Sequence, residues 1–69
     1  MMKLEYDKEA DAAYLYLKYP IKAGEAKKTV KINDNFYIDL DSTGKPLGIE
    51  ILDASKTLDK KALAEAQTA

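Results

Sequence analysis

The clearest structural signal in this 69-residue chain is Asp39-Leu40-Asp41-Ser42-Thr43-Gly44-Lys45-Pro46-Leu47-Gly48-Ile49-Glu50-Ile51-Leu52-Asp53-Ala54-Ser55. Apolar and polar residues alternate on both sides of its centre, which is the period of a strand with one buried face. The centre contains Gly44, which adopts a positive φ without steric cost, and Pro46, which suits the first position of a strand. The segment therefore predicts a β-hairpin that leads into the start of a helix.

The rest of the chain supplies three more strands and the body of that helix. Residues 2–6, 13–18 and 26–32 are expected to be strands, and the turns between most of them are short, which favours an antiparallel meander. Beyond Leu52, good helix formers recur at helical spacing, and Asp53 or Ser55 can cap a helix start, as can Thr57 or Asp59. We therefore predict an α+β fold in a single domain over residues 1–69. It consists of one antiparallel meander sheet of about five strands (2–52) with one C-terminal helix (within 53–67) packed on one face.

The alternation divides the side chains between two faces of this sheet. The helix is expected to cover the apolar face, which comprises Leu4, Leu15, Leu17, Val30, Ile32, Ile38, Leu40, Ile49 and Ile51. The opposite face carries a candidate interaction face, defined as Tyr14, Tyr16, Tyr37, Asp39 and Glu50. One thin helix cannot cover both faces, and aromatic residues are enriched in interface cores, so we predict that this face binds a partner. The alternative is a solvated outer face on which tyrosines are simply good strand residues.

Two segments resemble a known family. The stretch Asp39-Leu40-Asp41, Gly44 and the run from Gly48 to Ser55 are similar to the C-terminal signature of domain-of-unknown-function family 2283. The run Tyr6-Asp7-Lys8-Glu9-Ala10-Asp11-Ala12-Ala13-Tyr14-Leu15 resembles the opening of the same family. The resemblance covers residues 2–58 and implies a small prokaryotic cytosolic protein of β-rich, meander-plus-helix form. Members of the family look as if they often stand beside small toxin-like genes, so it also implies an antitoxin-like role. The family has no established catalytic residues to carry over.

Composition narrows the functional classes. The chain contains no histidine and no cysteine, so it lacks the commonest general base, the commonest transition-metal ligand and any disulfide or thiolate chemistry. The first residues, Met1-Met2-Lys3-Leu4-Glu5, contain no apolar signal-peptide core, and no run approaches the roughly 18 apolar residues of a membrane span. These features predict a cytoplasmic protein that needs no cofactor and does not contact a membrane.

Charge is unevenly distributed, although the formal net charge is only −1. Residues 18–31 carry a net charge of +4, and residues 34–53 carry −4. We favour cross-strand pairing within the chain over complementary patches that orient self-association. Asp7, Glu9 and Asp11 are expected to form a charged, solvated turn. Gly48 is expected to let another group approach its strand closely.

The leading functional hypothesis is a non-enzymatic protein–protein interaction module, either a homodimer or the binder of a small protein partner. It would act through the candidate interaction face or an exposed sheet edge. The alternative is a carboxylate-based protein centred on Asp39 and Glu50 that binds a divalent metal or hydrolyses a substrate. No nucleophile or base accompanies these carboxylates, so we predict that the chain is not an enzyme. A third interpretation is weak nucleic-acid binding through Lys27, Lys28 and Lys31, and the net charge argues against it.

Overall fold

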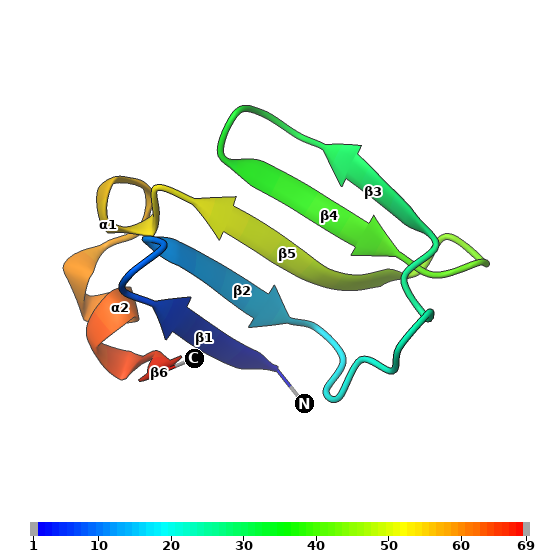
Figure 1. Ribbon diagram of the computed structural model, residues 1–69, viewed down its shortest axis with the longest axis horizontal. Coiled ribbons are helices and arrows are strands. Elements are labelled where there is room, and N and C mark those ends of the chain that lie inside the picture. Colours follow the sequence, from blue (N-terminus) through cyan, green and yellow to red (C-terminus); the bar gives the residue numbers. More distant parts are fainter. Residues whose placement is uncertain (1, 69) are drawn as a thin grey trace.

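The computed structural model describes residues 2–68, which form one sheet with two short helices at one end (Figure 1). The α+β class and the antiparallel sheet of five main strands are confirmed. The strands are β1 (Lys3–Asp7), β2 (Ala12–Tyr16), β3 (Lys28–Lys31), β4 (Phe36–Leu40), β5 (Pro46–Leu52) and a short β6 (Gln67–Thr68). The helices are α1 (Ala54–Thr57) and α2 (Lys60–Glu65).

The strands are ordered β3-β4-β5-β2-β1-β6 across the sheet. The hairpin β1-β2 and the meander β3-β4-β5 each follow the chain, and β2 pairs antiparallel with β5 between them. Residues 17–27 carry the chain around the end of the sheet to β3 (Figure 1). This order places the N-terminal hairpin directly beside the end of β5, so the two segments that resemble one family become neighbours in space.

The C-terminal helical region differs from the single helix that the sequence predicts. It is divided into α1 and α2 because Leu58 has extended backbone angles, φ −106° and ψ 152°. Leu58 and Leu63 both pack against the core, but five residues apart on a straight helix they would point roughly 140° away from each other. The break lets both leucines reach the sheet. The hydroxyl of Thr57 lies within hydrogen-bond distance of the carbonyls of Leu52 and Asp53, at 3.1 and 2.9 Å.

The apolar face has the register that the alternation predicts. One row crosses the five main strands and comprises Leu4, Leu15, Ile49, Ile38 and Val30. Within the described residues the buried hydrophobic side chains are few: Ala13, Leu47, Ile51 and Ala54. The side chains packed around this core belong to Leu4, Tyr6, Phe36, Ile49, Leu58 and Leu63. Ala13, Ile51 and Ala54 form the core cluster at the end of the sheet where the helices are, whereas Leu47 is buried separately near the start of β5.

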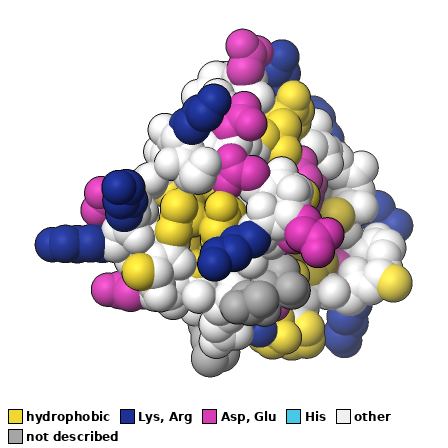
Figure 2. Space-filling view, turned by 60° about the vertical axis from the view of Figure 1, so that its left-hand side comes forward, with side chains coloured by type: hydrophobic (Ala, Val, Ile, Leu, Met, Phe, Trp, Pro, Cys, Tyr) yellow, Lys and Arg dark blue, Asp and Glu magenta, His cyan; other side chains and the backbone are white. Residues whose placement is uncertain are grey.

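The rest of the apolar face has no helix over it. The helices lie beside the end of β5, while β3 and much of β4 extend away from them (Figure 1). We define the open apolar patch as Leu15, Val30, Ile38 and Leu40, which share the apolar face but stand outside the helix-bound core; Val30 is exposed and the other three are half-buried. Val30 is 38% exposed, and Ile32, which directly follows β3, is 54% exposed. Figure 2, in which the helical side of the molecule comes forward, shows hydrophobic side chains reaching the surface between charged ones on that side as well.

Within residues 2–68, no helix has the length and apolar character that crossing a lipid bilayer requires.

Candidate functional site

The five residues of the candidate interaction face do share one face of the sheet. The strand register forms two neighbouring cross-strand rows on this face. One row comprises Glu5, Tyr14, Glu50, Tyr37 and Lys31, and the other comprises Lys3, Tyr16, Gly48, Asp39 and Thr29. Charged and aromatic side chains therefore alternate across the sheet, and most of them bond to one another.

Tyr14 reaches across β5 to bond Asp39 on β4. Its hydroxyl donates to Asp39 Oδ2 at 2.8 Å, and Thr29 Oγ1 donates to Asp39 Oδ1 at 2.6 Å. The ring passes over Gly48, where an added Cβ would lie 2.6 Å from Tyr14 Cζ. This confirms the expected close approach at Gly48. Burial raises the pKa of the Tyr14 hydroxyl above its ordinary value, and the hydrogen bond to Asp39 raises the pKa further.

A second cluster lies beside the first on the same face. The Tyr16 hydroxyl donates to Glu5 Oε1 at 3.1 Å, and Lys3 Nζ lies 3.2 Å from Glu5 Oε2. Lys3 also sits over the Tyr19 ring, 4.1 Å from its centroid, and the rings of Tyr16 and Tyr19 meet edge-on at 5.1 Å. The sequence did not reveal Tyr19 as part of this face, because Tyr19 follows β2 and lies outside its alternation.

The two carboxylates of the metal-binding alternative lie in different environments. Asp39 is opposite Gly48, whereas Glu50 is opposite Tyr37 in the other row. Both oxygens of Asp39 already accept hydrogen bonds from side chains, so a cation there would have to share these oxygens with Tyr14 and Thr29. Among residues 2–68, no group of three or more carboxylate side chains is arranged to hold a metal ion.

The sequence predicted that Asp7, Glu9 and Asp11 form a charged, solvated turn between β1 and β2. For Asp11 this prediction was wrong, because its side chain bonds to other parts of the chain. Asp11 Oδ1 accepts the Tyr6 hydroxyl at 2.7 Å and the backbone N–H of Ser55 at 3.0 Å. Asp11 Oδ2 accepts the Ser55 hydroxyl at 2.7 Å, and the carbonyl of Asp11 accepts the N–H of Ala54 at 2.9 Å. These bonds dock α1 onto the hairpin. The hydroxyls of Ser55 and Tyr6 lower the pKa of Asp11 below its ordinary value.

The cap of α1 also differs from the expectation. Asp53 occupies the N-cap position with a left-handed backbone, φ 50°, but its side chain makes no capping hydrogen bond. The carboxylate that receives a first-turn N–H belongs instead to Asp11 on a distant hairpin. The helix start therefore depends on tertiary structure.

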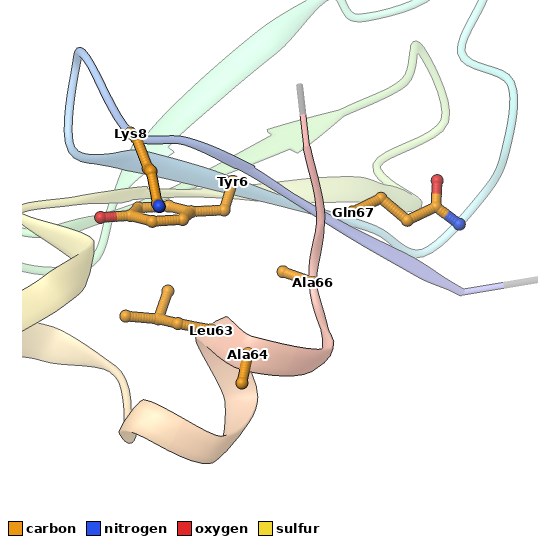
Figure 3. Close-up of a pocket in the computed structure, with 6 residues that line it drawn as sticks. All are labelled: Tyr6, Lys8, Leu63, Ala64, Ala66 and Gln67. Atoms are coloured by element: carbon orange, nitrogen blue, oxygen red, sulfur yellow. The ribbon is translucent and has the colours of Figure 1, made fainter.

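A pocket of about 400 Å³ lies between β1 and α2 (Figure 3). Its lining residues are Tyr6, Lys8, Leu63, Ala64, Ala66 and Gln67. Figure 3 shows the Tyr6 ring and Lys8 above Leu63. Lys8 is the one charged residue of this lining, and the Tyr6 hydroxyl is already bonded to Asp11. The lining offers no pair of acid and base for catalysis.

The comparison with protein families gives one match, over residues 3–55, to the family described as "Protein of unknown function (DUF2283)". No curated protein and no solved structure matches the chain. The family match spans β1 to the start of α1, and so it includes both partners of the bond between Asp11 and Ser55. Because the match extends over most of the 69 residues, the chain belongs to the DUF2283 family.

Proposed function

We propose that this chain is a non-enzymatic protein–protein interaction module, and that a second copy of the chain covers its open apolar patch. The observation that carries the proposal is the incomplete cover of the apolar face. A sheet with one hydrophobic face has to bury that face against another layer. Here α1 and α2 provide that layer at one end of the sheet only.

The accessible surface supports this proposal. A folded monomer of 7.7 kDa is expected to expose about 4300 Å², whereas this chain exposes 4937 Å². The excess of roughly 600 Å² approaches the ~800 Å² that each partner buries in an interface of standard size. The molecule is also flat, with extents of 34 × 24 × 18 Å. A second layer over the open apolar patch would remove this excess.

The charge distribution favours a second copy as the occupant. Among the strand residues whose side chains share the apolar face, Lys28 alone is charged, and it lies at the edge of the sheet. An uncharged, aliphatic surface does not repel its own copy, and homodimer interfaces are more apolar than other interfaces. The opposite face has less to gain from a partner, because the hydroxyls of Tyr14 and Tyr16 are already bonded within the chain.

Two further parts of the proposal, an antitoxin-like role and action in the cytoplasm, rest on the family resemblance and on composition. The resemblance supports an antitoxin-like module, in which the assembled chain would bind a second small protein. The absence of cysteine is compatible with action in the cytoplasm, where disulfides are rare.

The test is the solution mass across a concentration series, measured by sedimentation for the wild type and two matched variants. Val30→Glu places a charge in the open apolar patch at a side chain that is 38% exposed, so the monomer should still fold. Tyr37→Lys places a charge on the opposite face, in the neighbouring strand. We expect a wild-type dimer that Val30→Glu dissociates and Tyr37→Lys preserves, with thermal unfolding confirming that both variants fold.

Two outcomes would contradict the proposal. A wild-type chain that stays monomeric at high concentration would exclude the second copy as the occupant. If Tyr37→Lys dissociates the dimer and Val30→Glu preserves it, the dimer interface lies on the candidate interaction face and not on the open apolar patch.

A further inference from the structure

We propose that the free edge of β3 binds an extended acidic segment of a partner protein by adding it to the sheet as a further strand. The proposal rests on the backbone and the lysines of the β3 edge, and Val30 is the one residue that it shares with the open apolar patch. Strand addition uses backbone hydrogen bonds for affinity and alternate side chains for specificity.

The edge of β3 is available for pairing. β3 is the outermost strand on its side of the sheet, and all four of its residues are exposed. The N–H of Ile32 donates to the carbonyl of Phe36 at 2.8 Å, which identifies that pair as hydrogen-bonded. Because such pairs alternate in antiparallel strands, the N–H and C=O groups of Thr29 and Lys31 point to the free edge.

The charge of this edge selects the kind of strand that it can accept. Lys27 and Lys28 form no ion pair with any of the described residues, and Lys31 is bridged to the exposed Asp34 at 3.2 Å. Two copies that paired through β3 would bring these lysines together, and edge lysines are a known means of preventing such pairing. The same lysines would attract carboxylates, so an acidic strand fits where a second β3 does not.

Apolar side chains beside the edge give a second reason to expect an occupant. Val30 is 38% exposed and Ile32 is 54% exposed. An added strand would cover part of both and extend the apolar face by one strand.

The alternation of side chains along β3 specifies where acidic and apolar residues should stand in the added strand. Lys28 and Val30 share the apolar face, while Thr29 and Lys31 share the opposite face. A strand lying along this edge would carry an acidic residue opposite Lys28, an apolar residue opposite Val30 and another acidic residue opposite Lys31. The two acidic residues are then three positions apart and point to opposite faces.

The experiment uses the full chain and a ten-residue peptide, blocked at both ends, with Glu-Val-Thr-Glu at its centre. In antiparallel pairing with β3, this order places Val opposite Val30 and the two Glu residues opposite Lys31 and Lys28. The control peptide has the same composition with Glu-Val-Glu-Thr at the centre, which places both carboxylates on one face. Affinity is measured by fluorescence anisotropy, and amide hydrogen exchange shows where the peptide lies. We expect the first peptide to bind more tightly, to protect the amides of Thr29 and Lys31, and to lose affinity as salt is added.

Four variants separate charge from backbone pairing. Lys28→Glu should weaken binding by about tenfold or more, whereas Lys61→Glu, an exposed lysine of α2 at the other end of the molecule, should leave it unchanged. Lys31→Pro removes an outward N–H as well as the charge, so it should weaken binding more than Lys31→Ala does. Equal affinity of the two peptides, indifference to Lys28→Glu, or protection at amides outside β3 would each overturn the proposal.

Discussion

The carboxylate of Asp11 holds Ser55 by two hydrogen bonds, 3.0 Å from its N–H and 2.7 Å from its hydroxyl, across 44 residues of sequence. The contact joins the β1-β2 turn to the first turn of α1. An isolated helix of four residues is not stable in water, so α1 owes its position to this contact and to the burial of Ala54, which is 0% exposed. The helix in turn brings Leu58 to the core.

Replacing Asp11 should therefore destabilise the fold more than its position in a surface turn suggests. Asp11 has φ 49°, a conformation that asparagine tolerates, so Asp11→Asn preserves the backbone and removes the charge. We expect the thermal midpoint to fall by about 5 °C or more, measured by circular dichroism. The control is Asp7→Asn in the same turn, because Asp7 bonds only the nearby N–H groups of Glu9 and Ala10. Equal shifts for the two variants would contradict the role given to Asp11.

Acid should remove the contribution of Asp11. Hydrogen bonds from the hydroxyls of Ser55 and Tyr6 lower its pKa in the folded chain. A carboxyl whose folded pKa lies below its unfolded value, about 3.9, stabilises the fold above that value and ceases to do so as the pH falls through the folded pKa. Urea unfolding at pH 7 and at pH 2.5 should thus show a smaller difference between wild type and Asp11→Asn at the lower pH. A difference that stays constant would mean that the carboxylate charge is not involved.

The sequence predicts those elements of the fold in which polar and apolar residues recur at a regular spacing. Alternation identified the main strands and assigned Tyr14, Tyr37 and Asp39 to one face, because inward and outward side chains differ in polarity. The contact between Asp11 and Ser55 has no period, so the sequence predicted a solvated turn at Asp11 and a candidate helix cap at Ser55 without connecting the two. The division of the helix was also missed, although Asp59 was among the candidate caps and occupies the N-cap position of α2. The bonds of Asp39 depend on strand register, which a single sequence does not determine.

Gly48→Ala tests the crossing of Tyr14 over β5. Alanine is usually the better strand residue, by roughly 0.5–1 kcal/mol. Here its Cβ would lie 2.6 Å from Tyr14 Cζ, so the ring must move away and lose Asp39. We expect the free energy of unfolding to fall by about 1–3 kcal/mol. Urea denaturation measures it, and the same substitution in a Tyr14→Ala background should be nearly neutral or stabilising. An increase in stability in the wild-type background would show that the ring does not lie there.

The stability of the chain should also fall at high pH, in part through Tyr14. Burial and the bond to Asp39 raise the pKa of its hydroxyl above the ordinary value of 10. A group whose folded pKa is raised stabilises the fold fully below its unfolded pKa, and this stability is lost as the pH rises from about 10 toward the folded pKa. The free energy of unfolding should therefore decline above pH 10, and Tyr14→Phe should decline less steeply. Tyr6 and Tyr16, whose pKa values are also raised, contribute to the slope that remains.

Ultraviolet absorbance gives a direct check on this assignment in the folded chain. At about pH 11 an ordinary tyrosine is roughly 90% ionised, whereas Tyr14 should still hold its proton, since ionisation would set a phenolate against the carboxylate of Asp39 at hydrogen-bond distance. Wild type and Tyr14→Phe should thus show the same tyrosinate absorbance at that pH, provided that both remain folded by circular dichroism. If the wild type shows one additional tyrosinate at pH 11, the Tyr14 hydroxyl is open to solvent and the cross-strand bond to Asp39 does not persist in solution.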